Sequence, residues 1–600
     1  MTTKLYSEVW DLDVFFKGGS HSPELNEHLE KVKTQIVALE NRIEAFSVPT
    51  KVEDAKEVHD LLESITATAL NLREASAVIG CFVAANTKDK QALLLQSDVS
   101  TIQARFSTVR LKVEQTIAKT EEDVWGALLE TKELSQFTFV LNEWRENVQL
   151  QLSEAEESLI TSLSVDGYQA WGQLYNQLVG DMEIEMTVDG MTKKLSVGQA
   201  NNLASHPDAA VRKEVFEKLE AAWKEKEDFF ASALNHLAGF RLAVYNKRGW
   251  DSVLQEPLMR NRMSQETLDA MWGAIQANKQ PFIDYLTTKA KMIGAEKMNW
   301  YDLNAPITSQ TTKMSYQEGA AFILAHFGKF GPELEAFSRQ AFEEGWIEAE
   351  DRPNKRPGGF CTGMPASQQS RIFMTYSGSM SNVATLAHEL GHAFHSYALR
   401  PVHYLNRQYA MGVAETASTF AEMIVADAAL KSAQTEDEKL ALLEDKIKRS
   451  ATFFMNIHAR FLFETRFYEE RKEGVVSAAR LNELTEEAQK EAYGDALDVV
   501  HPHFWASKLH FYITGTPFYN FPYTFGYLFS LSIYAKALTE GEGFEKKYID
   551  LLRDTAVMSV EDLAMKHLGE DITKEDFWAK GVALCVKDVE EFLKIASKER

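Results

Sequence analysis

The sequence has only three cysteines in 600 residues, Cys81, Cys361 and Cys585, and they are scattered without a paired spacing. This argues against a disulfide framework and for a reducing compartment. The start, MTTKLYSEVWDLDVFF, also lacks the basic segment followed by a continuous apolar stretch that a secretory signal requires. Both absences predict a cytoplasmic protein.

Positive charge is scarce as well. The chain carries 64 basic and 88 acidic residues, which gives a net charge of -24. Such a surface repels nucleic acid and anionic lipid, so neither is an expected partner. The longest apolar stretch, residues 520–538, contains Pro522, Gly526 and Lys536. It therefore predicts a buried aromatic helix and no membrane span.

The residues that are present indicate a folded, mostly helical protein, with 45% hydrophobic and 25% charged side chains. Residues 22–132 show helical periodicity and predict antiparallel helices, with one apolar stripe formed by Leu25, Leu29, Val32, Ile36 and Leu39. Residues 182–197 contain two alternating runs around Asp189-Gly190 and predict a β-hairpin. We expect an N-terminal helical region over 1–200 that ends in this hairpin, and a catalytic region over 201–600.

A loop-rich segment precedes the main motif. Residues 352–378 are rich in proline, glycine and serine, which excludes a continuous helix. Within this segment, residues 371–376 (RIFMTY) predict a short strand. An extended peptide could add to this strand as to a sheet edge, with Gly378 as an unencumbered neighbour.

The motif that carries chemistry lies in residues 381–400, which predict a helix with Ser381 or Asn382 as its N-cap. His388 and His392 are four residues apart, so both imidazoles leave the same helical face and can bind one metal ion. Glu389 lies at the edge of that face, where its carboxylate can take a proton from water at the metal. The pattern predicts a water-activating zinc site.

A catalytic zinc ion needs a third protein ligand. His395 is on the same face, but it lies about 10.5 Å from His388 along the helix axis, so a shared ion would require a distorted helix. A second predicted helix, residues 411–430, offers Glu415 and Glu422 on one face amid small residues that permit close packing. We predict Glu415 as the third ligand, Glu422 as a carboxylate that orients a histidine, and His395 as a neighbour.

Several of these segments resemble one family. The runs GGFCTG, SRIFMTYSG, TLAHELGHAFHS and AETASTFAE are similar to the thimet-oligopeptidase family of zinc peptidases, and most of all to its bacterial oligoendopeptidase F branch. WDLDVFF near the start, YDLNAP at residues 301–306 and HFYITGTPFYNFPYTFGYLFS from His510 agree with that branch. The resemblance covers most of the chain.

The resemblance implies an elongated helical bowl of two halves around a deep channel, with one zinc ion at its floor and a small β element next to the motif helix. His388, His392 and Glu415 would bind the zinc ion, and Glu389 would act as general base. The substrates would be short peptides cleaved at internal bonds, because a folded protein does not enter such a channel.

The resemblance also implies hydrogen-bond donors to the oxyanion of the transition state. The available counterparts are His510, Tyr519, Tyr523 and Tyr527. The spacing between His510 and the GYL motif departs from the thimet pattern, so Tyr527 is the firmest match, and the choice between Tyr519 and Tyr523 stays open.

Two other functions remain open at this point. The same fold could remove single C-terminal residues as a zinc carboxypeptidase, or it could bind peptides without cleaving them. Intact His388, Glu389, His392 and Glu415 weigh against the second alternative. No exposed heptad seam or terminal arm indicates an oligomer interface, and the oligomeric state is left open.

Overall fold

The computed structural model describes residues 5–188, 191–308 and 313–598. Helices dominate it, and the strands form only two small sheets, so the predicted mostly α fold is confirmed. The N-terminal helices are α1 (Pro23–Ala45), α2 (Ala55–Ala85), α3 (Lys90–Ala118), α4 (Glu122–Leu129), α5 (Thr138–Gln149) and α6 (Glu154–Ser164).

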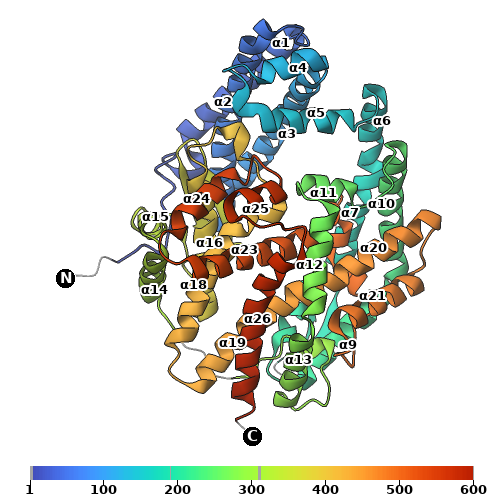
Figure 1. Cartoon of the computed structure of the whole chain (residues 1–600). Helices are drawn as coiled ribbons and strands as arrows, with labels where there is room; N and C mark the ends of the chain where they lie inside the picture. Colours follow the sequence, from blue (N-terminus) through green and yellow to red (C-terminus); the bar gives the residue numbers. More distant parts are fainter. Residues whose placement is uncertain (1–4, 189–190, 309–312, 599–600) are drawn as a thin grey trace.

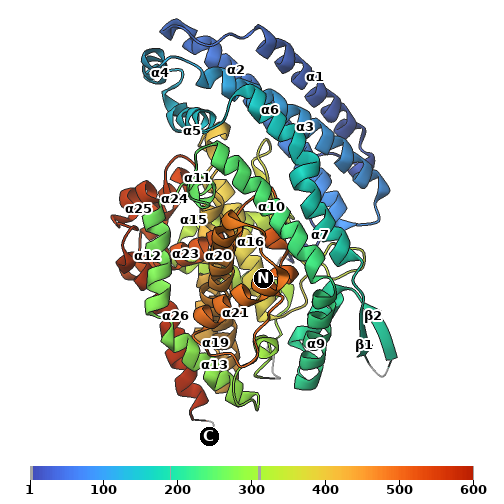
Figure 2. The same cartoon turned by 90° about the vertical axis from the view of Figure 1, so that its right-hand side faces the viewer.

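The first three helices pack side by side as the sequence pattern predicts. Ser22 caps α1 by accepting a hydrogen bond from the backbone N–H of Leu25, and Pro23 occupies the first turn. The apolar stripe of α1 is buried against α2 and α3. Figures 1 and 2 show these helices as a layer along one end of the molecule, above the more compact remainder of the chain.

The chain then passes through a π-helical turn at Val165–Gln169 and α7 (Ala170–Gly180) into a hairpin of β1 (Ile184–Val188) and β2 (Met191–Leu195). The antiparallel strands pair from Ile184 with Leu195 to Val188 with Met191, which confirms the predicted hairpin. The predicted turn residues, Asp189 and Gly190, lie outside the described residues.

The next segment is helical again and leads toward the central sheet. Its helices are α8 (Val197–Asn202), α9 (Ala209–Glu225), α10 (Glu227–Lys247), α11 (Gln255–Arg260), α12 (Gln265–Ala277), α13 (Gln280–Met292), α14 (Tyr316–Phe330) and α15 (Pro332–Glu343). The sheet that follows consists of β3 (Ile347–Glu348), β4 (Phe360–Met364) and β5 (Gln369–Phe373) in the order β3-β5-β4. It contacts the motif helix, as predicted for the small β element.

The rest of the chain contains the motif helix, α16, and the helices that follow it. Its elements are α16 (Met380–Ala398), α17 (Met411–Ala414), α18 (Thr416–Ser432), α19 (Glu436–Ala451), α20 (Ile457–Glu473), α21 (Ala478–Tyr493), α22 (Phe504–Ser507), α23 (Phe521–Glu540), α24 (Phe544–Asp554), α25 (Val560–Leu568) and α26 (Glu575–Ala596). The predicted aromatic helix is α23, and most of its side chains are buried. None of the helices in the described ranges combines the length and the apolar character needed to span a bilayer.

Buried apolar side chains form two clusters that meet at the central sheet. One cluster contains residues from Trp10 to Trp144, and the other extends from Tyr175 toward the C-terminus. Successive residues of β5 point to opposite faces, so Phe373 belongs to the first cluster and Ile372 to the second. The central sheet therefore contributes to both apolar clusters. The predicted domain boundary near residue 200 stays a prediction.

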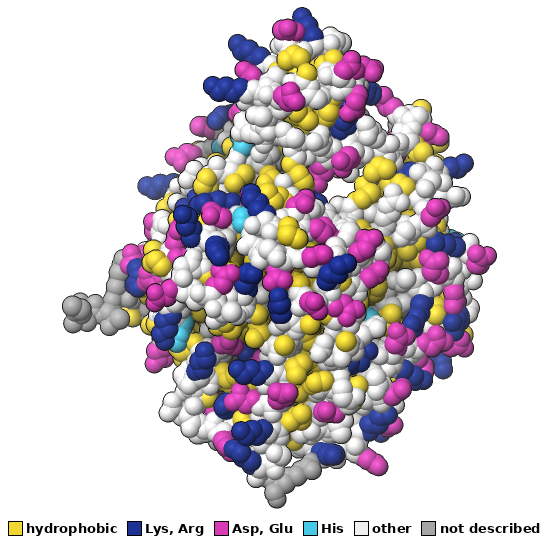
Figure 3. All heavy atoms as spheres, viewed as in Figure 1, with side chains coloured by type: hydrophobic (Ala, Val, Ile, Leu, Met, Phe, Trp, Pro, Cys, Tyr) yellow, Lys and Arg dark blue, Asp and Glu magenta, His cyan; other side chains and the backbone are white. Residues whose placement is uncertain are grey.

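A wide opening separates the N-terminal helices from the rest of one face. A cavity of about 1340 Å³ lies between α5 and the segment around α11, and Figure 3 shows the hollow on the surface. Two further cavities, of about 660 and 760 Å³, meet at the motif helix, which supplies residues to both. The site described next therefore borders both of these smaller cavities.

Candidate metal centre and active site

The helix α16 carries both histidines of the motif in the centre of the molecule (Figure 1). It begins two or three residues earlier than predicted, because Ser379 and not Ser381 or Asn382 is the N-cap. The Ser379 hydroxyl accepts from the Asn382 N–H, and the Asn382 side chain accepts from the Ser379 N–H. The rings of His388 and His392 lie with their centroids 4.9 Å apart and nearly perpendicular.

The predicted third ligand lies at a break between two helices. Residues 411–430 do not form the continuous helix that we expected, since α17 ends at Ala414 and α18 starts at Thr416. Glu415 occupies the junction with φ −85° and ψ 0°. Its Oε2 atom is 3.2 Å from Nε2 of His388 and 3.7 Å from Nε2 of His392.

Two glycines allow this close approach, and sequence reasoning missed both. A Cβ atom on Gly391, between the two histidines, would clash with the backbone of Ala417 and lie 2.6 Å from Cα of Ser418. A Cβ atom on Gly526 of α23 would lie 3.1 Å from Cβ of Glu415. The small residues of α18 did predict close helix packing, and the HELGH run contained the signal for the first glycine.

The three side chains fit a metal ion. One ligand atom from each of His388, His392 and Glu415 lies within 4.8 Å of the other two. Burial lowers the pKa of His392 to about 4. Burial raises the pKa of Glu415, but the hydrogen bond to His388 and the charges of both histidines outweigh it and hold the pKa at about 2. A neutral imidazole and an ionised carboxylate are the forms that bind zinc.

Glu422 contacts the opposite side of the first histidine. Its Oε2 atom is 3.1 Å from Nδ1 of His388, and its other oxygen forms an ion pair with Arg449 of α19. If Nδ1 of His388 carries the proton, it donates to Glu422 and leaves Nε2 free for a metal ion. The arrangement suits the orienting role predicted for Glu422, and Arg449 is an additional partner that the sequence did not indicate.

Glu389 is buried beside the three candidate ligands. Its Oε2 atom is shielded from solvent and has no hydrogen-bond partner among the described residues, and the residue lines both cavities that meet at α16. Burial raises the pKa of Glu389 to about 7, and the nearby charge of Glu415 adds to this effect. A cation between the ligands would favour the ionised carboxylate.

One tyrosine of the predicted oxyanion group reaches the same cavity. Tyr523, in the first turn of α23, lines the cavity of about 660 Å³ together with Glu389 and Glu415. Its hydroxyl donates to the hydroxyl of Tyr519 at 3.0 Å. His510 lies behind Tyr519, with ring centroids 5.0 Å apart. Its Nδ1 atom is 2.7 Å from Oδ1 of Asn520, so the Nδ1 side of His510 is engaged away from the candidate ligands.

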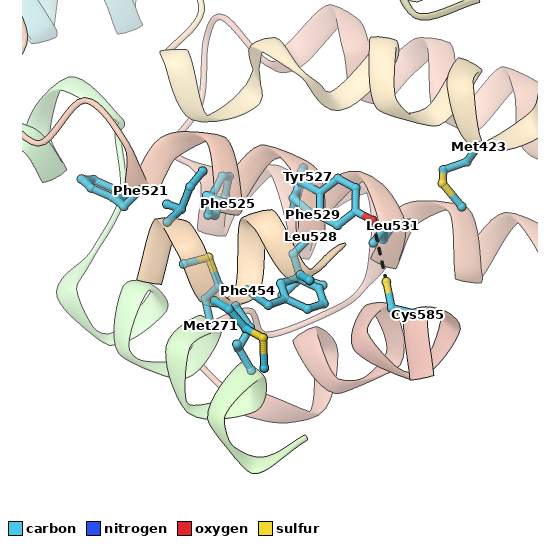
Figure 4. Close-up of a cluster of buried hydrophobic side chains, with 14 of the residues drawn as sticks. Met271, Met423, Phe454, Phe521, Phe525, Tyr527, Leu528, Phe529, Leu531 and Cys585 are labelled. Atoms are coloured by element: carbon cyan, nitrogen blue, oxygen red, sulfur yellow. Dashed lines mark hydrogen bonds between the residues drawn. The ribbon is translucent and has the colours of Figure 1, made fainter. Parts of the chain in front are cut away.

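Tyr527 has a different environment from the one expected. Its ring lines the edge of the same cavity, but it stacks on Phe453 at 4.3 Å, and its hydroxyl lies 2.8 Å from the Ser450 hydroxyl. Figure 4 shows the hydroxyl directed toward Cys585 within a cluster of buried apolar side chains. These contacts give no support to an oxyanion role for Tyr527.

His395 is fully buried one turn beyond the second histidine. Its Nε2 atom is 2.8 Å from the Thr555 hydroxyl, and its ring stacks on Tyr409 at 4.3 Å. Burial lowers the pKa of His395 to about 3. The contact of His395 with Thr555 joins α16 to the segment after α24, and among the described residues it makes no hydrogen bond to the candidate ligands.

The sheet edge next to the site is not the strand that we predicted. The predicted edge, residues 371–376, overlaps β5, which lies in the middle of the sheet with β3 parallel on one side and β4 antiparallel on the other. Its hydrogen-bonding groups are therefore engaged on both sides. The free edge belongs to β4, whose residues line the cavity of about 760 Å³ with His388 and Glu389.

A helix with two histidines and an adjacent glutamate, completed by a carboxylate from a second helix, defines a metallopeptidase site of the HExxH type. Comparison with known proteins agrees. The sequence model described as peptidase family M3 matches residues 202–584, and the one described as oligopeptidase F matches residues 117–184. The chain belongs to peptidase family M3, and it is a metal-dependent peptidase, as the motifs predicted.

The matched relatives extend this likeness over most of the chain. An oligoendopeptidase F of Lactococcus lactis subsp. cremoris, encoded on the chromosome, is 27% identical over 68% of this chain and 67% of its own length. An oligoendopeptidase F homolog of Lactococcus lactis subsp. lactis is 24% identical over 98% of this chain and 97% of its own length. A crystal structure of a protein from Chlamydophila abortus shares the fold, with a TM-score of 0.82, 19% identity and 98% of each chain covered.

Proposed function

We propose that the protein is a zinc-dependent endopeptidase that cleaves internal bonds of short peptides, with one zinc ion bound by His388, His392 and Glu415. The observation that carries this proposal is the meeting of one ligand atom from each of these three side chains within 4.8 Å, beside the buried carboxyl group of Glu389. The names of the matched relatives support the substrate class, since two of them are oligoendopeptidases.

A zinc ion in such a site supplies a Lewis acid that polarises the scissile carbonyl and makes water more acidic. Glu389 acts as general base: its carboxylate takes a proton from the attacking water and then gives that proton to the leaving amine. The buried position of Glu389 favours this transfer, because burial makes its carboxylate a stronger base than that of an exposed glutamate.

Tyr523 is the proposed donor to the oxyanion. It shares a cavity with Glu389, and its hydroxyl can turn from Tyr519 to a substrate oxygen without losing a buried partner in the core. Tyr519 and His510 would hold Tyr523 in place from behind. An extended peptide would lie along the free edge of β4, where backbone hydrogen bonds fix its register.

The test combines metal analysis with product mapping. Freshly purified protein should contain one zinc ion per chain, and chelation should abolish cleavage of a quenched peptide until zinc is returned. Glu389→Gln should keep the metal and the fold but lose turnover, because an amide does not accept the proton. Turnover at the parent rate in this variant would refute the assignment of the base.

Mass spectrometry of the products separates the proposal from its alternatives. Internal cuts in a peptide blocked at both ends indicate an endopeptidase, whereas cuts that need a free C-terminus and release single residues indicate a carboxypeptidase. Stoichiometric zinc without any product would indicate a protein that binds peptides only.

A further inference from the structure

The cavity along β4 has an unusual charge arrangement. Its volume is about 760 Å³, and its walls include Arg73 of α2 and Arg400 and Arg407 from the segment after α16. Within the described part of the chain, no ion pair involves any of the three, and their contacts are to a hydroxyl, an aromatic ring and backbone oxygens. Arg400 and Arg407 are half-buried and Arg73 is exposed, so one wall of this cavity carries two arginines that are only partly solvated and a third in contact with water.

The contacts of these arginines leave most of their donors free. Nη2 of Arg73 donates to the Thr362 hydroxyl of β4 at 3.0 Å. The guanidinium of Arg400 lies 4.8 Å from the ring centre of Tyr397. Arg407 donates from Nη2 to the backbone oxygen of Arg400 at 2.9 Å and from Nε to another backbone oxygen at 2.7 Å.

The partial burial of positive charge favours the binding of an anion in this cavity. Burial lowers the pKa of Arg400 and of Arg407, and the charge of Arg400 lowers that of Arg407 further. Like charges held together repel one another, and partial burial weakens the screening by water. A carboxylate placed between the arginines would remove this repulsion and would accept charge-assisted hydrogen bonds from them.

The cavity on the other side of the candidate metal ligands is different. There Arg449 pairs with Glu422, and Lys446 pairs with two aspartates at 2.7 and 2.8 Å. Lys448 lies 3.2 Å from Asp445. The cations of that cavity are thus neutralised by the protein itself. Of these two cavities, the one on the β4 side has arginines without an ion-pair partner among the described residues.

We propose that the cavity along β4 is a subsite for an anionic group of the peptide substrate, bound by Arg73 and Arg400 with Arg407 behind them. The inference rests on the proposed endopeptidase function. The anion is a carboxylate, because guanidinium groups bind carboxylates through paired N–H donors. It belongs either to the C-terminus of the peptide or to an aspartate or glutamate side chain at a fixed distance from the cleaved bond.

The experiment measures kcat/KM for matched peptides. One series replaces a single glutamate by glutamine at successive positions around the cut, and a second series replaces the free C-terminus by an amide. Parent enzyme, Arg73→Gln, Arg400→Gln and the double variant are compared. Arg42→Gln is the control. Arg42 of α1 donates to the Ser64 hydroxyl at 2.7 Å, a contact of the same kind as that of Arg73 with Thr362. Arg42 lines none of the three cavities described above.

At one position or at the C-terminus, the parent should prefer the charged peptide by about tenfold or more, the effect of one hydrogen bond to a charged group. Each arginine variant should reduce that preference, the double variant should remove it, and Arg42→Gln should keep it. The inference is wrong if the parent shows no preference, or if the double variant keeps it.

The two series distinguish the source of the carboxylate. If the C-terminus is bound, the cut stays at a fixed distance from that end when the peptide is lengthened at its N-terminus. If a side chain is bound, the cut follows the acidic residue. Either result supports the subsite.

A binding measurement separates this inference from the proposed function. The Kd of fluorescein-labelled charged and neutral peptides is determined by anisotropy with Glu389→Gln, alone and combined with the double arginine substitution. A preference for the charged peptide that disappears with the arginines supports the subsite even if the parent cleaves no peptide. Equal Kd values for both peptides overturn it even if the parent is an active peptidase.

Discussion

Gly391 offers the sharpest test of how the metal site is built. In Gly391→Ala, the new Cβ atom would lie 2.6 Å from Cα of Ser418, whereas carbon atoms in contact prefer about 3.5–4.0 Å. The helices α16 and α18 must therefore separate by about 1 Å. Because α16 carries His388 and Glu415 directly precedes α18, the separation should lengthen distances that tolerate only about 0.2 Å in a zinc site.

Two quantities should change together. Overpacking should lower the free energy of unfolding of the metal-free protein by about 1–3 kcal/mol, measured by urea unfolding. The zinc affinity, measured by competition with a chromophoric chelator, should fall by at least about tenfold, in the range seen when a supporting residue of a metal site is lost.

Gly80→Ala is the matched control. Gly80 lies within α2, and nothing lies within 4 Å of a Cβ atom at this position. This variant should keep the zinc affinity and gain up to about 1 kcal/mol of stability from the higher helix propensity of alanine. The reasoning is refuted if Gly391→Ala binds zinc as tightly as the parent and unfolds at the same urea concentration.

Three further predictions use other contacts. Arg449→Met removes the ion-pair partner of Glu422, so zinc affinity should fall by about 10- to 100-fold while neutral peptide analogues still bind; an unchanged affinity would contradict the role of Glu422. Tyr523→Phe should lower kcat by about 10²–10³-fold, whereas Tyr527→Phe should mainly cost about 1 kcal/mol of stability, and steady-state kinetics with urea unfolding distinguish the two. Burial lowers the pKa of His503, but hydrogen bonds to two glutamates outweigh it and raise the pKa above 6.5. The stability that charged His503 adds is present below pH 6.5 and is lost as the pH rises through its pKa in the folded protein. Between about pH 6 and 9, the free energy of unfolding should therefore decline less steeply in His503→Gln than in the parent, as urea unfolding would measure.

The sequence predicted the helical fold and the three side chains that meet at the candidate metal centre, because helical spacing is a local property. His388 and His392 follow from positions i and i+4, and the small residues of α18 indicated a partner helix close enough to supply Glu415. The order of the central sheet could not be read in the same way. β3 pairs with β5 over only two residues and lies about 20 residues upstream in the chain, so no periodic pattern reveals that β5 is central and β4 is the edge.

The tyrosines show what a motif match leaves undecided within a helix. Tyr519, Tyr523 and Tyr527 are four residues apart, and four residues turn a helix by about 400°, which leaves a rotation of about 40° at each step. Tyr519 precedes the first residue of α23, so its position is not fixed by the helix at all. The next step carries Tyr527 around toward Ser450 and Cys585 and away from Tyr519. A motif match aligns residues along the chain, but only the helix phase decides which hydroxyl faces the cavity, and this is why we transfer the proposed role from Tyr527 to Tyr523.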